Sequence, residues 1–204
     1  NLRLDSNILL RPSINARHEY TVLTQTSTTD FAQSPYASMH LNNAMIMANL
    51  PIQLGKRFHL GGSYQKVVAG FNANDENWKL SGRLNLGKIG ALAANITANK
   101  KRPDFRYLFY RSPLYAWDHR NTFNQVKQQR IGAKWTSKNN TISLAAAYKS
   151  LVNYTYLDSN NAVQQSPLTV NIFTARLGVN YTWRKWNISS SINFQENLSN
   201  VLIY

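Results

Sequence analysis

The stretch 173–194 constrains the fold most, because its apolar residues recur at every second position on both sides of a two-residue break at Arg184 and Lys185. A period of two makes one face of a strand apolar and leaves the other face in water. Strands this long, joined by a tight turn and flanked by tryptophan, are typical of a membrane-spanning β-barrel. The alternating positions are Phe173, Ala175, Leu177, Val179, Tyr181 and Trp183 before the break and Trp186, Ile188, Ser190, Ile192 and Phe194 after it.

Composition supports this interpretation. Of the 204 residues 43% are hydrophobic and only 16% are charged, whereas soluble domains have about 25% charged residues. No run approaches the roughly 20 apolar residues of a transmembrane helix. The chain has no cysteine, which excludes disulfides, thiol catalysis and thiolate metal sites.

Alternation elsewhere predicts about nine strands, and residues 1–11 are expected to hold the end of an earlier strand. Short turns at 54–56, 86–88, 136–140 and 184–185 alternate with longer loops near 25–37, 71–76, 101–119 and 152–167. This rhythm is typical of an up-and-down barrel in an outer membrane, with tight periplasmic turns and long extracellular loops. The strands are expected at 14–24, 38–53, 57–70, 77–87, 89–100, 120–136, 141–151, 168–183 and 186–196.

The predicted fold class is therefore all-β, an antiparallel up-and-down transmembrane β-barrel with about 9–10 strands present. We treat residues 1–204 as a single β-barrel domain. Bacterial single-chain barrels close with an even number of strands, and residues 197–204 show no clear closing strand. We therefore expect the chain to be a fragment of a longer barrel chain; a complete barrel is the alternative, which a terminal aromatic at Tyr204 would suit.

Aromatic side chains next to the short turns predict a girdle at one membrane interface, where amphipathic rings favour the headgroup layer. These residues are Phe58, Trp135, Trp183 and Trp186.

The net charge is +14, from 23 Lys and Arg against 9 Asp and Glu. Because a charged side chain facing lipid costs about 2–4 kcal/mol at mid-bilayer, cations that alternate with apolar residues are expected to face the lumen. The candidate lumen-facing residues are Lys79, Arg83, Arg130, Lys134, Lys149 and Arg176.

A basic and aromatic loop at 100–111 is the strongest local signal. Three interpretations remain open: its aromatics pack on each other while the charges stay solvated, it binds lipopolysaccharide phosphates, or it folds inward and narrows the pore in favour of anions. Its cations are Lys100, Lys101, Arg102, Arg106 and Arg111.

No catalytic, cofactor-binding or metal site is predicted, and we do not expect an enzyme. The four histidines His18, His40, His59 and His119 stand alone, without the close spacing of a metal site. A serine on the predicted lipid face, Ser190, has no evident histidine partner for hydrolysis.

The segment 90–196 resembles the putative porin family of Bacteroidota outer membranes. The resemblance implies an outer-membrane β-barrel with more strands than are present here, and it implies transport, but it supplies no functional residues. The landmarks, in order, are Arg102-Pro103, Tyr115-Ala116-Trp117, Asn121, Asn153-Tyr154-Thr155-Tyr156-Leu157, Gln164-Gln165, Tyr181, Trp183 and Ile192-Asn193-Phe194-Gln195.

Three functions follow as hypotheses. The first is a passive channel for small hydrophilic solutes with a basic lumen or rim, in the outer membrane of a Gram-negative bacterium and in contact with membrane lipid and lipopolysaccharide. The second is a structural or assembly component of a larger outer-membrane complex with other outer-membrane proteins and no open pore. The third, a soluble binder of nucleic acid, rests only on the basic pI near 10.1, and we expect no nucleic-acid partner.

Overall fold

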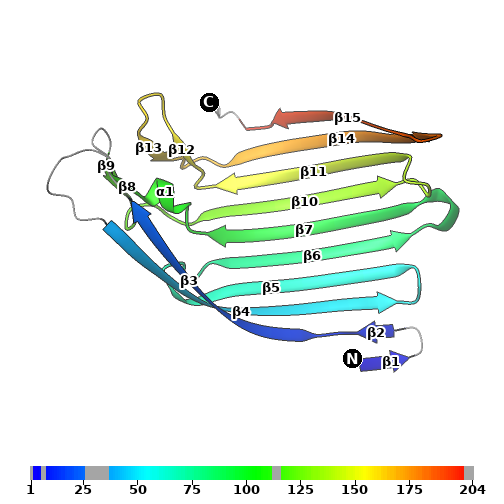
Figure 1. Cartoon of the computed structure of the whole chain (residues 1–204), viewed down its shortest axis with the longest axis horizontal. Coiled ribbons are helices and arrows are strands. Elements are labelled where there is room, and N and C mark those ends of the chain that lie inside the picture. Colours follow the sequence, from blue (N-terminus) through cyan, green and yellow to red (C-terminus); the bar gives the residue numbers. More distant parts are fainter. Residues whose placement is uncertain (1, 6–7, 26–36, 112–115, 200–204) are drawn as a thin grey trace.

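The alternating segments form one large antiparallel sheet (Figure 1). The computed structural model describes residues 2–5, 8–25, 37–111 and 116–199. The elements are β1 (Leu2–Asp5), β2 (Ile8–Leu10), β3 (Ser13–Gln25), β4 (Ala37–Leu54), β5 (Phe58–Gly70), β6 (Glu76–Asn85), η1 (Gly87–Ile89), β7 (Ala91–Lys101), α1 (Phe105–Leu108), β8 (Phe109–Arg111), β9 (Ala116–Asp118), β10 (Val126–Thr136), β11 (Ile142–Val152), β12 (Thr155–Leu157), β13 (Val163–Gln165), β14 (Val170–Trp183) and β15 (Trp186–Asn197).

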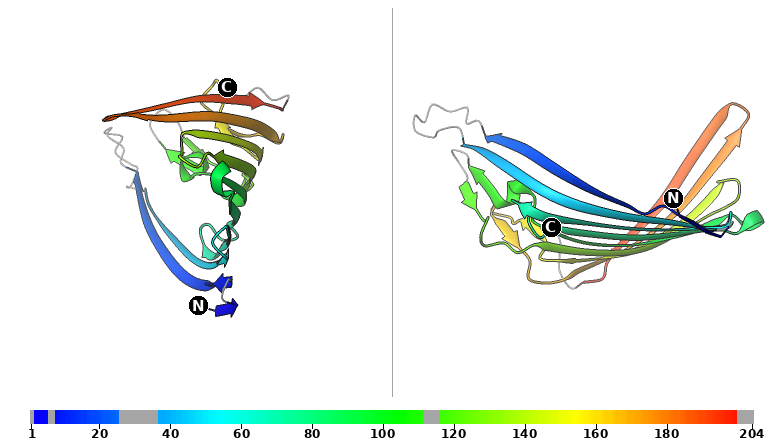
Figure 2. Two further views of the ribbon diagram at one scale, coloured as in Figure 1. Left: turned by 90° about the vertical axis from the view of Figure 1, so that its right-hand side faces the viewer. Right: turned by 90° about the horizontal axis from the view of Figure 1, so that it is seen from below.

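The sheet runs in the order β1-β2-β4-β5-β6-β7-β10-β11-β14-β15, with β3 also paired to β4. Neighbours in space are neighbours along the chain, so the predicted up-and-down topology is confirmed. β2 and β3 are one strand interrupted at Arg11 and Pro12, because both pair with β4 in the same register, Leu10 opposite Ile52 and Ser13 opposite Asn49. The curved sheet is open between its two ends (Figure 2).

Each of the nine predicted strands is present, and one boundary is clearly wrong. The strand predicted at 120–136 begins at Val126, because the preceding residues turn back and the amides of Thr122 and Phe123 both donate to the carbonyl oxygen of His119. The predicted turn at 86–88 overlaps the 3-10 helix η1, which ends at Ile89, and the loops predicted at 101–119 and 152–167 contain short elements of their own. Most of the loop predicted at 25–37 lies outside the described residues.

Cross-strand pairing divides the sheet into an apolar and a polar face. Residues paired across an antiparallel ladder point to the same side, so one continuous row of the apolar face can be followed through the register from β4 to β15. Every member of that row is aliphatic or aromatic: Leu54, Phe58, Leu84, Leu92, Trp135, Leu144, Leu177 and Ile192.

The apolar side chains lie on the convex face and remain exposed. Leu80, Ile131 and Ile192 are 47%, 57% and 70% exposed. The short elements α1, β8 and β9 lie on the opposite, concave side (Figure 2). Continuous exposed apolar surface of this extent is what lipid requires and water disfavours. None of the helices in the described part of the chain has the length and apolarity that a bilayer crossing requires.

The apolar band runs obliquely across the ladder. At its long-loop edge the band reaches Tyr64 on β5. On β15 it reaches only Phe194, which lies two pairing rows closer to the short turns. Two rows are about 13 Å along a strand, and six strand spacings are about 29 Å, so the strands tilt by about 25° from the normal of the band. Tilted strands are a property of membrane barrels.

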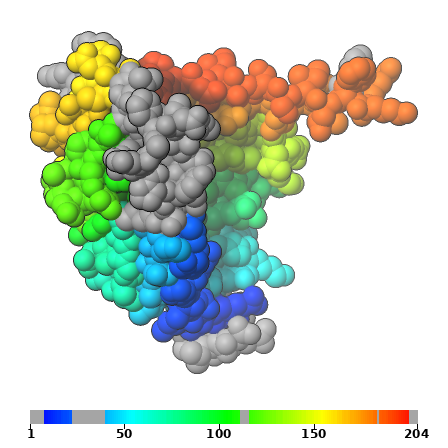
Figure 3. All heavy atoms as spheres, turned by 60° about the vertical axis from the view of Figure 1, so that its left-hand side comes forward, coloured from blue at the N-terminus to red at the C-terminus, as the bar shows by residue number. Residues whose placement is uncertain are grey.

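The β14–β15 hairpin projects beyond the rest of the sheet at the short-turn end (Figure 3). Pairing with β11 stops at Val179 opposite Ile142, whereas β14 and β15 stay paired as far as Trp183 opposite Trp186. Tyr181 and Trp186 are therefore 55% and 69% exposed.

Candidate functional site

The six cations predicted to face the lumen all occupy the concave face, and pairing gathers them into two rows. In the first, the Arg83 row, Arg83, Lys134 and Arg176 are connected through Ala93 and Ala145. In the second, the Lys79 row, Lys79, Arg130 and Lys149 are connected through Thr97. Within β6 and within β10, the two rows are four residues apart, about 13 Å.

The strip between the two rows is neutral and closely packed. A side chain added at Gly132 would place its Cβ 3.3 Å from the Ala147 Cβ and 3.4 Å from Asn95 Oδ1. Asn95 Oδ1 is buried and has no hydrogen-bond partner among the described residues. The members of the strip are Gly61, Ser81, Asn95, Gly132, Ala147, Thr174 and Gln195.

The six cations have no carboxylate partner in the described structure. Its ion pairs join Arg17 to Glu19, Lys66 to Glu76, Arg106 to Asp104, and Arg120 to Asp118. All six are exposed or half-buried. The two rows therefore place unpaired positive charges on the concave face between β6 and β14.

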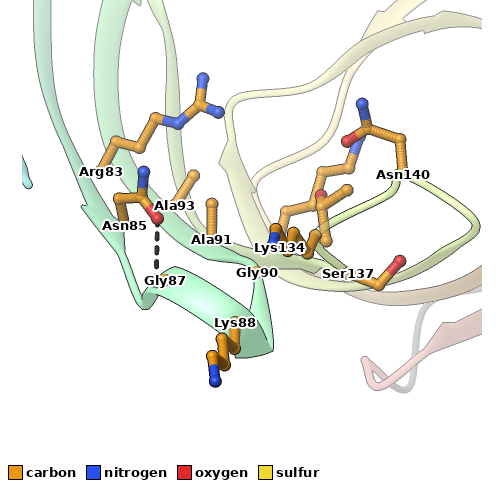
Figure 4. Close-up of a pocket in the computed structure, with 12 residues that line it drawn as sticks. Arg83, Asn85, Gly87, Lys88, Gly90, Ala91, Ala93, Lys134, Ser137 and Asn140 are labelled. Atoms are coloured by element: carbon orange, nitrogen blue, oxygen red, sulfur yellow. Dashed lines mark hydrogen bonds between the residues drawn. The ribbon is translucent and has the colours of Figure 1, made fainter.

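A hollow of about 860 Å³ lies on this face near the short turns (Figure 4). Arg83 and Lys134 stand on either side of it, with Ala91 and Ala93 of the intervening strand between them. Two strand spacings separate the two cations, about 10 Å between their backbones. The small alanines leave the space between the charges open to a solute.

At the long-loop end the concave face is covered by its own loops. Leu41, Met45 and Val67 point inward from β4 and β5 and are 8%, 5% and 6% exposed. They line a cavity together with Phe71, Pro103 and Phe105, so the segment 101–105 folds over the concave face.

The aromatics of the infolded loop contact one another. Phe105 lies edge-on to Phe71 at 6.2 Å and 5.9 Å from Phe109, and Tyr110 stacks on Trp117 at 4.7 Å. The indole Nε1 of Trp117 donates to the Arg106 carbonyl oxygen at 3.0 Å. Leu108, in the same segment, is 1% exposed.

The cations of the basic loop do not act as one cluster. Lys100 lies on the convex face opposite Lys127, whereas Lys101 and Arg102 line the concave cavity. The Arg102 guanidinium lies 5.0 Å from the Phe71 ring centre, and Arg106 pairs with Asp104 at 3.2 Å. The side chain of Arg111 lies outside the described residues.

A polar network holds the infolded loops together. Asp75 Oδ1 accepts from the Arg102 amide and from Gln125 Nε2, both at 2.8 Å. Gln165 Nε2 donates to the carbonyl oxygens of Asn124 at 2.7 Å and Asn153 at 3.1 Å, and its Oε1 accepts from the Asn124 amide at 2.9 Å. Loops that are far apart in sequence are thereby fixed to each other.

The carboxylates of this region have shifted pKa values. Burial raises the pKa of Asp75, against the lowering effect of its hydrogen bonds from Arg102 and Gln125. The hydrogen bonds from the Arg120 guanidinium lower the pKa of Asp118 to about 2, and Arg120 Nε donates at 2.8 Å. Arg120 also lies 4.8 Å from the Phe109 ring centre.

The four predicted interface aromatics do not share one pairing row. Phe58 and Trp135 lie in the same convex row, whereas Trp186, paired with Trp183, lies three rows further toward the turn of the projecting hairpin. The side chain of Trp183 lies outside those described. A further aromatic pair, Tyr64 and Trp78 with ring centres 4.1 Å apart, lies at the opposite edge of the band.

Several residues of these sites were not predicted from the sequence. Asp75, Gln125 and Gln165 carry the loop network, and nothing in their sequence spacing points to one another. The convex positions of Lys66 and Lys127 could have been predicted, because the period of two continues past the apolar rows and places both side chains on the same face as those rows. Among the described residues, no group of three or more His, Asp or Glu could hold a metal ion.

The exposed apolar face, the tilted strands and the polar concave face define a transmembrane antiparallel β-barrel architecture. The chain belongs to the putative porin family, whose model matches residues 3–202. Among solved structures it is similar to a chain named "Copper transporter OprC", with a TM-score of 0.67 and 15% sequence identity. That match covers 97% of this chain and 36% of the other, so this chain spans little more than a third of its length. No curated protein matches the chain.

Proposed function

We propose that the protein forms a non-enzymatic, passive channel in the outer membrane of a Gram-negative bacterium, and that its lumen favours small anionic solutes. Membership of the putative porin family and the fold similarity to a transporter support transport across an outer membrane. In the proposed orientation the short turns face the periplasm, and the infolded long loops narrow the extracellular mouth of the channel.

One observation carries the anion preference: six cations lie in two rows on the concave face, and none of them pairs with a carboxylate among the described residues. At a distance of about 7 Å in water, one unit charge changes the energy of a passing ion by about 0.6 kcal/mol, nearly a factor of three in local concentration. The change has opposite sign for anions and cations. Salt weakens it over a Debye length of about 10 Å at 0.1 M.

The test is the reversal potential of the full-length protein in a planar bilayer under a KCl gradient. Arg83→Gln with Lys134→Gln removes two cations beside the hollow of Figure 4 and is expected to lower the anion-to-cation permeability ratio. The matched control, Lys100→Gln with Lys127→Gln, removes two cations from the convex face and should leave the ratio unchanged. Absence of conductance steps from demonstrably folded protein would refute the channel, and equal ratios in both variants would refute the role of the rows.

A second candidate, an assembly component without an open pore, has a specific observation in its favour. From β6 to β14, one convex row consists of small residues between two bulky rows, and small residues let another protein approach closely. Co-purification of a stoichiometric partner together with silent bilayers would favour this function. The small residues are Gly82, Ala94, Ala133, Ala146 and Ala175.

A further inference from the structure

A second basic feature lies on the opposite, convex face, at the long-loop edge of the apolar band. Pairing connects Lys66 on β5, Glu76 on β6, Lys100 on β7 and Lys127 on β10 into one row, the convex lysine row. The apolar side chains of the band lie on the same face. These lysines therefore face the surroundings of the barrel and not its lumen.

The depth of this row follows from the row beneath it. Tyr64 and Trp78 lie one pairing row closer to the band, with their rings 4.1 Å apart, and Trp78 is 54% exposed. Tyrosine and tryptophan favour the headgroup layer. The next row, two residues further along each strand, lies about 7 Å beyond these rings, where lipid phosphates are found.

The charges of the convex lysine row are unbalanced. Lys66 Nζ pairs with Glu76 Oε1 at 3.4 Å, and no ion pair of the described residues involves Lys100 or Lys127. Lys100 and Lys127 are nevertheless direct cross-strand partners. Like charges directly opposite each other are destabilising in a sheet. A bound anion would offset this repulsion.

We propose that Lys100 and Lys127, supported by Lys66, bind the phosphate groups of an outer-leaflet glycolipid of the lipid A type. The negative phosphate groups would balance the positive charges of Lys100 and Lys127. The acyl chains of the glycolipid would lie along the exposed apolar rows below the Tyr64–Trp78 pair. This inference rests on the outer-membrane location and orientation proposed above. It places the lipid contact on the convex face and does not involve the infolded part of the basic loop.

The test uses full-length protein in a zwitterionic detergent, titrated with diphosphorylated lipid A and, in parallel, with its dephosphorylated form. Electrostatic attraction between each lysine and an anionic lipid surface strengthens binding, and the loss of two lysines should weaken it about 30-fold. We therefore expect Lys100→Gln with Lys127→Gln to lose phosphate-dependent binding about 30-fold. Lys100→Arg with Lys127→Arg keeps both charges and should bind normally.

The concave double variant Arg83→Gln with Lys134→Gln is the matched control, because it removes the same charge from the other face. It should bind lipid A as wild type does while its ion selectivity changes. Folding of every variant is checked by its heat-dependent mobility in gels. Equal binding of both lipid forms by wild type, undiminished binding by the convex variant, or full competition by equimolar inorganic phosphate would overturn the inference.

The two proposals fail separately. Loss of lipid binding in the convex variant with unchanged conductance supports the lipid site whatever the solute preference. Absence of conductance steps together with intact phosphate-dependent lipid binding would refute the channel proposal and support the lipid site.

Discussion

Lipid contact of the apolar rows can be tested at two neighbouring residues of β14. Ala175 lies on the convex face, paired with Ala146 and Phe194, and Thr174 lies on the concave face, paired with Ala147 and Gln195. Arginine at each position adds the same side chain at nearly the same depth. The two variants differ in which face receives the charge.

The expected magnitudes differ clearly. On a lipid face an arginine costs about 2–4 kcal/mol near the midplane. On the concave face Thr174→Arg meets water, and the cations nearest to it are Arg176, two residues away on the same strand, and Lys149, diagonally across on β11. At about 7–8 Å in water each repulsion is about 0.5–0.6 kcal/mol. The hydrogen bond lost from Thr174 Oγ1 to the Ala147 carbonyl oxygen is long, at 3.4 Å.

The measurement is the free energy of unfolding of the full-length protein in phosphatidylcholine vesicles, followed by tryptophan fluorescence in urea. Ala175→Arg should lower it by about 2 kcal/mol or more, and Thr174→Arg by about 1 kcal/mol or less. Equal losses, or a larger loss at Thr174, would mean that the convex rows do not face hydrocarbon. The membrane assignment would then be wrong.

Three further predictions concern the loops and turns. Burial raises the pKa of Asp75, so the folded protein should become more stable as the pH falls through the raised pKa to about 4. Asp75→Asn should abolish this gain in stability, measured as thermal unfolding over a pH series. Gln165→Ala should cost about 1–3 kcal/mol and speed hydrogen exchange in the long loops, whereas the exposed Gln164→Ala should not. Gly90→Ala should reduce the folded fraction on gels far more than Gly87→Ala. Both glycines have a positive φ, 120° and 68°, but a Cβ at Gly90 would lie 2.0 Å from the Thr136 backbone oxygen, whereas at Gly87 no described atom lies within 4 Å.

Each of these has a contrary outcome. A pH profile unchanged by Asp75→Asn would place the titration elsewhere. Unaltered exchange in Gln165→Ala would mean that the loops are held by their aromatic core alone. Equal folding of the two glycine variants would show that the sheet can shift to admit a Cβ at Gly90.

Local pattern was sufficient for the strands and their faces. A period of two is a property of the extended backbone itself, so the sides of Lys79, Arg83 and Arg176 follow from their immediate neighbours without knowledge of any partner strand. The same reasoning predicted the order of short and long connections. It misplaced the start of β10, where backbone hydrogen bonds to His119 form a turn that hydrophobicity does not reveal.

Register and loop docking were decided by the tertiary structure. Pairing between strands brings the six cations into two rows and puts Lys100 opposite Lys127, residues 27 positions apart in number whose partnership no local period contains. The tertiary structure also divides the basic loop between the two faces of the sheet. The segment that contains Leu108 packs on the concave side, where Arg102 lies against the Phe71 ring. Alternation acts between adjacent residues, whereas register and loop packing depend on contacts between distant ones. The sequence by itself therefore determined which residues meet lipid or water, and the folded sheet determined which charges meet each other.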